Sequence, residues 1–371
     1  MPASLTAAAE LLGACPVPAV AEIDPQWLTS ALEQAGIACG AYVRDLQAQS
    51  IGTGQVGENV RFTLTWSAPR ADLPATVVGK FPSRSEVSRA TAASGGVYVR
   101  EVGFYRDLQA QVSIRTPTIR YLGEDRADNS FVMIMDDLDP AEQGDQLAGT
   151  DLAGASLAVD AAAGLHASTW GRAEELAALD WLELPGPERG AVVAERYNLL
   201  FPGFAARYHD KLSDDDVELG RRLGGSIEAM GTSYRGARCV VHNDFRLDNM
   251  LYGLADGEPR VTVVDWQTVG IGFGPTDVAY FLGAGMLPAL RRAHEAGLVD
   301  RYIGDLRRQG VDADREEVWH NYRLGTPSGY IMAVVASQIV EQTSRGDEMF
   351  VVMASRHADQ MRAMELRELL G

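Results

Sequence analysis

The stretch VVHNDFRLDNMLYG, residues 240–253, decides the fold class of this 371-residue chain. It places a histidine, two aspartates and two asparagines between apolar residues of the kind that form buried strand ends. Buried polar side chains need hydrogen-bonding partners, so a cluster of this kind is costly without a purpose. A polar turn that closes a hairpin is the simplest interpretation, and the spacing of the residues favours a second one.

Within this stretch, His242, Asp244 and Asn249 have the spacing H-x-D-x-x-x-x-N, which is typical of a phosphoryl-transfer catalytic loop. Such a reaction needs a carboxylate that orients the attacking hydroxyl and accepts its proton, and Asp244 suits this role. It also needs oxygen ligands for magnesium, which we expect from Asn249 and from Asp265, a residue that follows an apolar strand end in VVDWQ. We expect His242 to hydrogen-bond within the loop rather than to act as a base.

Four further polar residues are candidates for a role beside this motif, two within it and two elsewhere in the chain. Arg246, two residues after Asp244, either reaches the γ-phosphate and offsets its developing charge or is a surface arginine. Asp248 is expected to be a surface carboxylate. Asp277 precedes an apolar helical run in GPTDVAYFL, which predicts that it caps the helix or braces the loop. His166 lies among small residues in AAAGLHAS, and we expect a core or loop-bracing role for it.

Gly52, Gly54 and Gly57 form the pattern G-x-G-x-x-G in IGTGQVGEN, residues 51–59. A dinucleotide-binding fold, and hence an oxidoreductase, requires a helix directly after these glycines, but residues 60–66, VRFTLTW, alternate as a strand. A glycine-rich turn between two strands is typical of kinases, in which its backbone N–H groups face the phosphates of a nucleotide. An ordinary glycine-rich hairpin is the alternative.

Lys80 and Lys211 are the only lysines among 33 basic residues. Lys80 ends the strand-like run ATVVGK, where a kinase places the lysine that pairs with the α- and β-phosphates. Glu101 lies on the helix that follows and could pair with this lysine, with a solvated helix face as the alternative. The rarity of lysine indicates that position 80 needs a compact ammonium rather than a guanidinium.

Hydrophobic periodicity divides the chain into two parts. Residues 40–138 read as several strands with one helix, and the chain after Pro140 reads as mainly helical apart from two strand-like runs between 238 and 270. These patterns predict an α+β fold with a small N-terminal lobe, built from an antiparallel sheet and one main helix, and a large helical C-terminal lobe. The expected domains are a helical extension at 1–39, a nucleotide-binding lobe at 40–138, and a lobe at 139–371 that carries the catalytic loop, the metal site and the acceptor-binding helices. Helical segments are predicted near residues 151–170, 188–209, 214–231, 286–309, 314–342 and 346–370.

Composition and charge exclude several classes of protein. With 46% apolar residues, the chain is expected to be globular. The net charge of -18 is spread along the sequence, which argues against nucleic acid and anionic membranes as partners. Three widely spaced cysteines indicate neither a disulfide framework nor a zinc site and fit a cytoplasmic location. The N-terminal stretch is a poor signal peptide, and no apolar run reaches membrane-spanning length.

Taken together, these motifs resemble those of the aminoglycoside phosphotransferase and choline kinase superfamily, and within it the ecdysteroid-kinase-like branch. The resemblance extends over about residues 40–285, in the order found in the family, and it implies a two-lobed protein-kinase-like fold. It is carried by IGTGQVGENVRFTL, Lys80, REVGFYRDL, FVMIMDDL, GLHAS, HNDFRLDN and VVDWQTVGIGFGPTDVAYF.

This resemblance implies that ATP is held at a hinge near Met135 to Leu138 and that its γ-phosphate passes to a hydroxyl of a small molecule. By position, it implies Asp244 as the base and Asn249 and Asp265 as magnesium ligands. Among the departures from related sequences, DWQ stands where protein kinases have D-F-G.

The other departure is Asn243, which stands where the family usually has glycine. Neither departure removes a chemical group that the reaction needs, but an asparagine at this position changes the expected backbone of the loop.

The sequence therefore predicts an ATP- and Mg2+-dependent O-phosphotransferase that acts on a hydroxylated small molecule, as a monomer or homodimer. Acidic residues in SDDDVE, with Glu341, Asp347 and Glu348, would suit an aminoglycoside-like acceptor, whereas aromatic residues would suit another antibiotic or an apolar alcohol. A nucleotide-binding pseudokinase with a regulatory or scaffolding role is the alternative, and it is disfavoured because every group needed for the reaction is present. A protein kinase is disfavoured because no APE-like or long activation segment follows Asp265. The aromatic residues that would suit an apolar acceptor are Trp170, Trp181, Tyr197, Phe201, Phe204, Trp319 and Tyr330.

Overall fold

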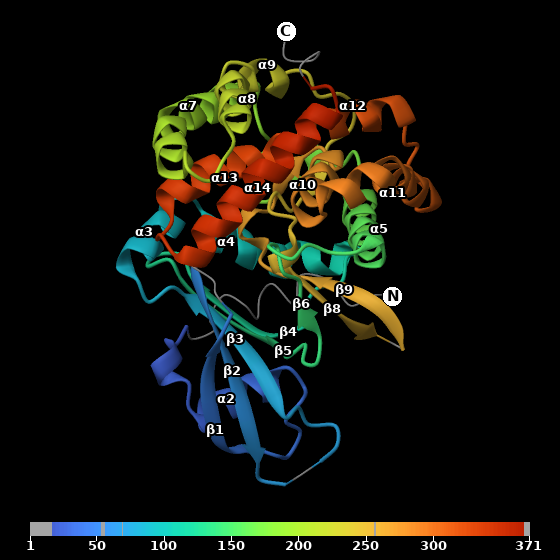
Figure 1. Ribbon diagram of the computed structural model, residues 1–371. Helices are drawn as coiled ribbons and strands as arrows, with labels where there is room; N and C mark the ends of the chain where they lie inside the picture. Colours follow the sequence, from blue (N-terminus) through green and yellow to red (C-terminus); the bar gives the residue numbers. More distant parts are fainter. Residues whose placement is uncertain (1–16, 53–55, 69, 256, 367–371) are drawn as a thin grey trace. The chain divides into compact units, whose positions relative to one another are not determined.

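The computed structural model describes residues 17–52, 56–68, 70–255 and 257–366, and the chain forms two compact units (Figure 1). The N-terminal unit consists of Met1–Ala110, Thr116–Pro140 and Asp265–Gln267. The C-terminal unit consists of Gln111–Arg115, Ala141–Val264 and Thr268–Gly371. The antiparallel sheet of the first unit and the helices of the second confirm the predicted α+β fold class.

The N-terminal unit is built around an antiparallel sheet. Its strands are β1 (Val43–Ile51), β2 (Gly57–Trp66), β3 (Thr76–Pro82), β4 (Ile119–Asp125) and β5 (Ser130–Asp136), and their order in the sheet is β1-β2-β3-β5-β4. The alternation in the sequence of β2 places Val60, Phe62 and Leu64 in the core. Strand β3, which lies between β2 and β5, is buried over most of its length, and Lys80 is among its buried residues.

Helix α2 (Pro25–Gln34) packs against β1 and β4 of this sheet. Asp24 begins the helix, because its side chain accepts a hydrogen bond of 2.7 Å from the backbone N–H of Trp27. Leu28, Ala31 and Leu32 of the helix are buried together with apolar residues of the strands. The helix therefore shares the hydrophobic core of the N-terminal unit.

The predicted main helix is α4 (Val97–Gly103), which continues as a π-helical turn, η2 (Phe104–Leu108). Tyr98, Val102, Tyr105 and Leu108 are buried, as their helical spacing predicts. A further helix, α3 (Glu86–Ser94), is not predicted by the hydrophobic pattern, because its sequence EVSRATAAS contains one large apolar residue. The short 3-10 turns here are η1 (Val20–Glu22) and η3 (Gln109–Gln111).

The C-terminal unit is mainly helical, as the sequence predicts. Two of the predicted segments are each broken into two helices. Gly225 separates α8 (Asp214–Gly224) from α9 (Ile227–Gly231), and Pro327 separates α12 (Arg315–Gly325) from α13 (Ser328–Ile339), since proline lacks the N–H that would continue a helix. The other helices are α5 (Leu152–Thr169), α6 (Ala173–Leu176), α7 (Arg189–Tyr208), α10 (Pro275–Gly285), α11 (Pro288–Arg308) and α14 (Ser344–Ala363).

Helices α7, α8, α13 and α14 share one hydrophobic core, to which α10 contributes. In Figure 1, α13 and α14 lie side by side. Four of the aromatic residues considered for an apolar acceptor belong to this core, because Tyr197, Phe201, Phe204 and Tyr330 are all buried in it. These four side chains stabilise the fold, so they do not indicate an apolar acceptor.

Short strands hold both ends of the polar loop at residues 242–249. Strand β7 (Cys239–Val241) ends directly before the loop and pairs with β10 (Gly270–Gly272). A 3-10 turn, η4 (Leu247–Asn249), closes the loop, and β8 (Met250–Ala255) follows it. Strand β8 pairs with β6 (Glu142–Gln143) and β9 (Glu258–Val263), after which comes the turn η5 (Trp266–Thr268). The apolar flanks of the loop are therefore strands, as predicted.

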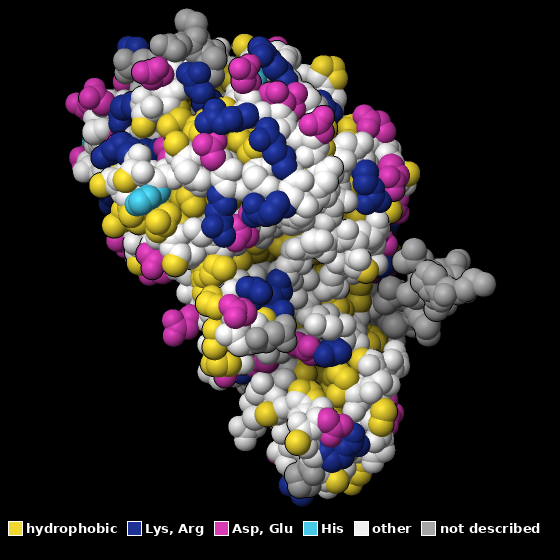
Figure 2. Space-filling view, turned by 90° about the vertical axis from the view of Figure 1, so that its right-hand side faces the viewer, with side chains coloured by type: hydrophobic (Ala, Val, Ile, Leu, Met, Phe, Trp, Pro, Cys, Tyr) yellow, Lys and Arg dark blue, Asp and Glu magenta, His cyan; other side chains and the backbone are white. Residues whose placement is uncertain are grey.

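Acidic and basic side chains are intermixed on the face of the C-terminal unit that Figure 2 shows. Exposed ion pairs of this unit include Arg301 with Asp160 and Arg315 with Asp300. The acidic charge of the chain is therefore not gathered into one patch on this face. Within the ranges that the structure describes, no helix is both long and apolar enough to cross a bilayer.

Candidate active site

Lys80 lies buried in the N-terminal unit between two carboxylates. Its side chain is 8% exposed, and its Nζ lies 2.6 Å from Oε1 of Glu101 and 3.1 Å from Oδ1 of Asp265. Burial alone would lower the pKa of Lys80, but the charges of Asp265 and Glu101 outweigh this effect and hold the pKa above its ordinary value. Lys80 is therefore an ammonium. Among the described residues, two of its three N–H donors have partners, which leaves one for an anion such as a phosphate.

Glu101 is the partner of Lys80 that the sequence suggested. It lies on α4, which packs against β5, and its side chain is 1% exposed. The alternative interpretation, a residue on a solvated helix face, is therefore wrong. The contribution of the ion pair to phosphate binding stays a prediction.

Gly52 and Gly57 lie at the two ends of the turn between β1 and β2, and Gly54 lies outside the described residues. Gly52 has a φ of +73°, a conformation that favours glycine. A Cβ atom at Gly57 would lie 3.3 Å from Cε of Lys80 and 3.2 Å from the carbonyl oxygen of Phe81. A side chain at position 57 would therefore press on Lys80. Phosphate binding by this turn stays a prediction.

Met135 and Leu138 lie at the end of β5, where the sequence predicts a nucleotide-binding hinge. Met135 is buried and pairs with Val78 of β3, whereas Leu138 follows the strand and is partly exposed. Asp137, between them, forms an ion pair of 2.6 Å with Arg61 of β2. This ion pair ties the segment after β5 to the sheet. Its contact with the base of a nucleotide stays a prediction.

Asp265 and Trp266 are held in the N-terminal unit by an aromatic stack. The ring of Trp266 is fully buried and lies parallel to the ring of Phe104 in η2, with a centroid distance of 3.6 Å and an angle of 5°. Asp265 has a φ of +67°, a left-handed conformation that few residues other than glycine, asparagine and aspartate adopt. The stack gives the tryptophan of DWQ a physical role, because it anchors the residue next to this aspartate.

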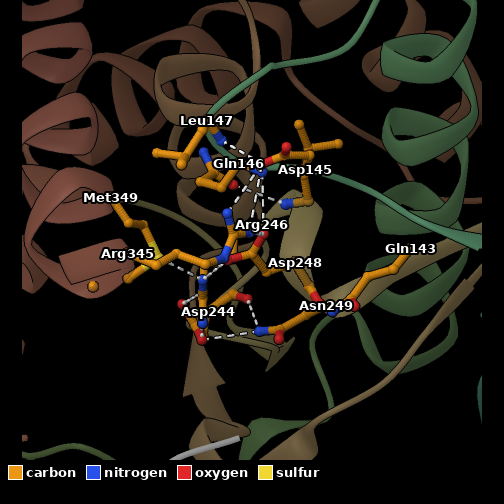
Figure 3. A network of polar contacts seen from close by, with 12 residues as sticks. Gln143, Asp145, Gln146, Leu147, Asp244, Arg246, Asp248, Asn249, Arg345 and Met349 are labelled. Atoms are coloured by element: carbon orange, nitrogen blue, oxygen red, sulfur yellow. Dashed lines mark hydrogen bonds and ion pairs between the residues drawn. The ribbon is translucent and has the colours of Figure 1, made fainter. Parts of the chain in front are cut away.

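Asp244 lies in the C-terminal unit, where hydrogen-bond donors surround its carboxylate (Figure 3). Nε of Arg246 lies 3.0 Å from both carboxylate oxygens. Nδ2 of Asn249 donates to Oδ2 and the hydroxyl of Tyr280 donates to Oδ1, each over 2.9 Å. Burial alone would raise the pKa of Asp244, but the charge of Arg246, then that of His242, and the bonds from Arg246 and Tyr280 hold the pKa below its ordinary value. Asp244 is therefore ionised at neutral pH.

Arg246 and Asp248 are both engaged in the loop (Figure 3). Arg246 is not a surface arginine, because its side chain is 18% exposed and its Nη1 lies 2.8 Å from Asp248 and 3.0 Å from the sulfur of Met349. The prediction that Asp248 is a surface carboxylate is wrong. Its side chain is 15% exposed and accepts hydrogen bonds from the backbone N–H of Gln146 at 3.0 Å and from Arg345 of α14 at 3.1 Å. A contact between Arg246 and a γ-phosphate stays a prediction.

Asp277 braces the backbone of the loop, which is one of the two roles that the sequence predicts for it. It is buried near the start of α10 and accepts hydrogen bonds from the backbone N–H groups of His242, at 2.6 Å, and Asn243, at 3.0 Å. Nε2 of His166 lies 3.2 Å from Asp277, and Nδ1 of His166 lies 2.8 Å from the hydroxyl of Tyr302. His166 is fully buried, so it has the bracing role expected of it.

His242 and Asn243 connect the loop to Val264, which precedes η5, and to Thr268, the last residue of η5. Nε2 of His242 lies 3.1 Å from the carbonyl oxygen of Val264, and the hydroxyl of Thr268 donates to the carbonyl oxygen of His242. Nδ2 of Asn243 donates to the carbonyl oxygen of Thr268 over 2.9 Å. His242 therefore hydrogen-bonds within the protein, as the sequence predicts.

The backbone of Asn243 explains why asparagine can replace glycine at this position. Its φ is +63°, and asparagine is one of the few residues other than glycine that adopt this conformation readily. We expect Asn243→Ala to lower the free energy of unfolding by about 1–2 kcal/mol more than Asn243→Gly, because both variants lose the amide hydrogen bond and alanine alone pays for the left-handed conformation. Urea denaturation of the two variants measures this difference. Equal losses would show that the backbone conformation is not what selects the residue.

Asn249 and Asp265 each offer an oxygen atom suited to Mg2+. The amide nitrogen of Asn249 donates to the carbonyl and to the carboxylate of Asp244, both over 2.9 Å, which assigns the other end of the amide as the oxygen. Asp265 is 35% exposed and uses Oδ1 for Lys80, which leaves Oδ2 for another cation. The described part of the chain contains no cluster of three or more His, Cys, Asp or Glu that could hold a metal by itself. Mg2+ does not need one, because it is commonly bound through one or two carboxylates and the substrate phosphates.

The acidic run SDDDVE starts a helix. Ser213 is the N-cap of α8, and three aspartates occupy its first turn, where negative charge stabilises the helix dipole. Asp216 pairs with Arg362 at 2.5 Å. Asp347 accepts a hydrogen bond of 2.6 Å from the hydroxyl of Tyr208. Asp216 and Asp347 therefore serve the fold. The suggestion of a cationic acceptor, which also drew on Glu341 and Glu348, stays a prediction.

Two side chains next to the site were not singled out by the sequence. Tyr280 lies three residues after Asp277 in TDVAY, so the two share one face of α10, and this spacing is the local signal that could identify it. Phe104 likewise lies three residues after Glu101. Tyr280 contacts Asp244, and Phe104 stacks on Trp266. Each partner is distant in the sequence, so the sequence alone does not reveal these contacts.

Comparison with known proteins agrees with this geometry. The model of the phosphotransferase enzyme family matches residues 58–318, more than half of the chain. No curated protein gives a significant sequence match. Among solved structures, the GDP complex of wild-type aminoglycoside 2'-phosphotransferase-IIIa is similar, with a TM-score of 0.53 and 17% identity over 85% of this chain and 94% of that one. Plasmodium vivax ethanolamine kinase has a TM-score of 0.53 and 11% identity over 86% of this chain and 83% of that one.

At these identities the similar structures show the fold alone, and it is the kinase-like fold that the sequence predicts. The ecdysteroid-kinase-like branch stays a prediction. The match of the family model, which includes the strand of Lys80, the loop of Asp244 and the turn of Asp265, shows that the chain belongs to the phosphotransferase enzyme family.

Proposed function

We propose that this protein is an ATP- and Mg2+-dependent O-phosphotransferase that moves the γ-phosphate of ATP to a hydroxyl of a small molecule. Membership of the family makes it a phosphotransferase. The observation that carries the finer proposal is the ammonium of Lys80, buried between Glu101 and Asp265 with one N–H left for a phosphate. A pseudokinase is not favoured, because the lysine, both of its carboxylate partners and the carboxylate of Asp244 are all in place.

In the proposed reaction the N-terminal unit binds the nucleotide. Lys80 pairs with the α- and β-phosphates, and the glycine-rich turn that begins at Gly52 presents backbone N–H groups to them. The segment from Met135 to Leu138 holds the adenine. Glu101 keeps Lys80 in place and charged.

Asp244 receives the proton of the acceptor hydroxyl. As the oxygen of that hydroxyl bonds to the γ-phosphorus, the bond from the γ-phosphorus to the bridging oxygen breaks and ADP leaves. Arg246 keeps Asp244 ionised and offsets negative charge that develops nearby. Asn249 and Asp265 would hold Mg2+, which neutralises charge on the phosphates when it is bound.

We place the acceptor among hydroxylated small molecules: an aminoglycoside-like compound, another antibiotic or an apolar alcohol. The similar structures are named for aminoglycosides and for ethanolamine, and one of them is described as a complex with GDP and kanamycin. The proposal also includes a cytoplasmic location, a monomer or homodimer, and neither nucleic acid nor membrane as a partner.

Acceptor-dependent release of ADP tests the proposal. The purified chain is incubated with MgATP, or with MgGTP in parallel, and with a panel drawn from the three acceptor classes. We expect one class to give ADP or GDP release that needs the acceptor, stops on addition of EDTA and resumes with excess Mg2+. Tight nucleotide binding without acceptor-dependent release from any class would overturn the proposal in favour of a pseudokinase.

A further inference from the structure

Tyr280 donates a hydrogen bond to the proposed base from the core of the C-terminal unit. Its hydroxyl lies 2.9 Å from Oδ1 of Asp244, and the residue is 2% exposed. Its ring belongs to the core that α7, α8, α13 and α14 share, and the ring centroid lies 5.8 Å from that of His357. A ring packed in this way has few rotamers open to it, so the hydroxyl is held at a fixed position.

Helix α10 contacts the loop twice from the same face. Asp277 accepts the backbone N–H groups of His242 and Asn243, and Tyr280, three residues later, donates to the side chain of Asp244. The first contact fixes the position of the loop backbone. The second fixes the direction of the carboxylate.

Three donors surround the carboxylate of Asp244. Tyr280 donates to Oδ1, Asn249 donates to Oδ2, and Nε of Arg246 lies equally far from both oxygens. Tyr280 therefore holds Oδ1 from the side of α10, whereas Asn249 holds Oδ2 from within the loop.

Tyr280 acts as a donor only. Burial, followed by the charge of Asp244, raises the pKa of Tyr280 well above its ordinary value, so the phenol keeps its proton. It therefore does not compete with Asp244 for the proton of the acceptor.

We infer that Tyr280 is a positioning residue for the proposed phosphoryl transfer, an inference that rests on the proposed function: acting through Asp244, its hydroxyl fixes the orientation of the carboxylate. The other charged and titratable groups of the C-terminal unit around this carboxylate belong to the loop, to α10 and to α14. They are Arg246, His242, Asp248, Asp277, Arg345 and His357.

The variant Tyr280→Phe removes the hydroxyl and keeps the ring. We expect kcat to fall by about 10- to 100-fold, the usual effect of losing a hydrogen bond to a charged group, and the KM for the nucleotide to stay unchanged. The loss should therefore appear in kcat and not in nucleotide binding, which distinguishes a misaligned carboxylate from a general loss of structure.

Tyr330→Phe is the matched control. Tyr330 is also buried in the C-terminal unit, and its hydroxyl donates to the backbone carbonyl of Asp216 over 2.8 Å. This variant should lower the free energy of unfolding by a similar amount and leave kcat unchanged. Equal losses of kcat in both variants would overturn the inference, since Tyr280 would then be only structural.

A second measurement does not depend on turnover. Crystal structures of the wild type and of Tyr280→Phe give the χ2 torsion of Asp244, with Tyr330→Phe as the control. The carboxylate should turn in Tyr280→Phe only, because that variant alone has lost the hydrogen bond to Oδ1. An unchanged orientation overturns the inference, whereas absent turnover of the wild type with the carboxylate turned in Tyr280→Phe would overturn the proposed function alone.

Discussion

Asp244→Asn should reduce kcat for acceptor-dependent ADP release by about 10²- to 10⁴-fold, the usual contribution of a general base. The asparagine keeps the size of the side chain and an oxygen that can accept from Tyr280, but it cannot take up the proton of the acceptor hydroxyl. Arg246 keeps Asp248 as a counter-ion, so the variant leaves no cation unpaired. Steady-state kinetics give kcat, and calorimetric titration with ATP should show little change in affinity.

Asp160→Asn is the control for this substitution. Asp160 is an aspartate on α5 with 36% of its side chain exposed, and it pairs with Arg301 at 2.6 Å. Loss of this exposed pair should change neither kcat nor stability by much, because such pairs contribute little. Wild-type turnover in Asp244→Asn would exclude Asp244 as the base and leave the loop with a structural role.

Lys80→Arg should lower kcat/KM by about 10²-fold, with a weaker affinity for ATP. The ammonium of Lys80 lies in a small space, within 3.1 Å of two carboxylates and beside Gly57, whose Cβ position is 3.3 Å from Cε of the lysine. A guanidinium is planar and larger, so it cannot keep both ion pairs and also present an N–H to the same phosphate. Kinetics and ATP titration of the variant measure both effects.

The chain supplies its own control in Lys211→Arg. Lys211 is the second of the two lysines and is exposed in the C-terminal unit. Its replacement should leave kcat/KM unchanged. Similar losses in the two variants would contradict the interpretation that the rarity of lysine marks a site at position 80.

Much of the fold could be predicted because its signals are local. The alternation in β2, the helical spacing of α4 and the apolar flanks of residues 242–249 all act within a few residues of one another. Helix α3 has no such signal, since its sequence holds one large apolar residue. Gly225 and Pro327 are residues that can end a helix, but the hydrophobic periodicity continues across both of them. Periodicity alone therefore predicts one long helix where the structure has two.

The candidate site could be predicted in part. The motif H-x-D-x-x-x-x-N predicts that His242, Asp244 and Asn249 share one loop, and the structure shows that they hydrogen-bond to one another or to its backbone. The exposure of Asp248 could not be predicted, because two of the donors that bury it, Gln146 and Arg345, lie about a hundred residues away in either direction.

The sequence by itself determined which chemical groups the protein carries and which of them share a loop, a strand end or a helix face. That information is local, because hydrophobic spacing and short motifs act over a turn or a strand. Only the tertiary structure decided which side chains contact the reactive groups: Tyr280 on Asp244, Trp266 against Phe104, and Asp277 on the backbone of Asn243. Those contacts join segments far apart in the chain, and they depend on how buried polar groups find partners when whole elements pack.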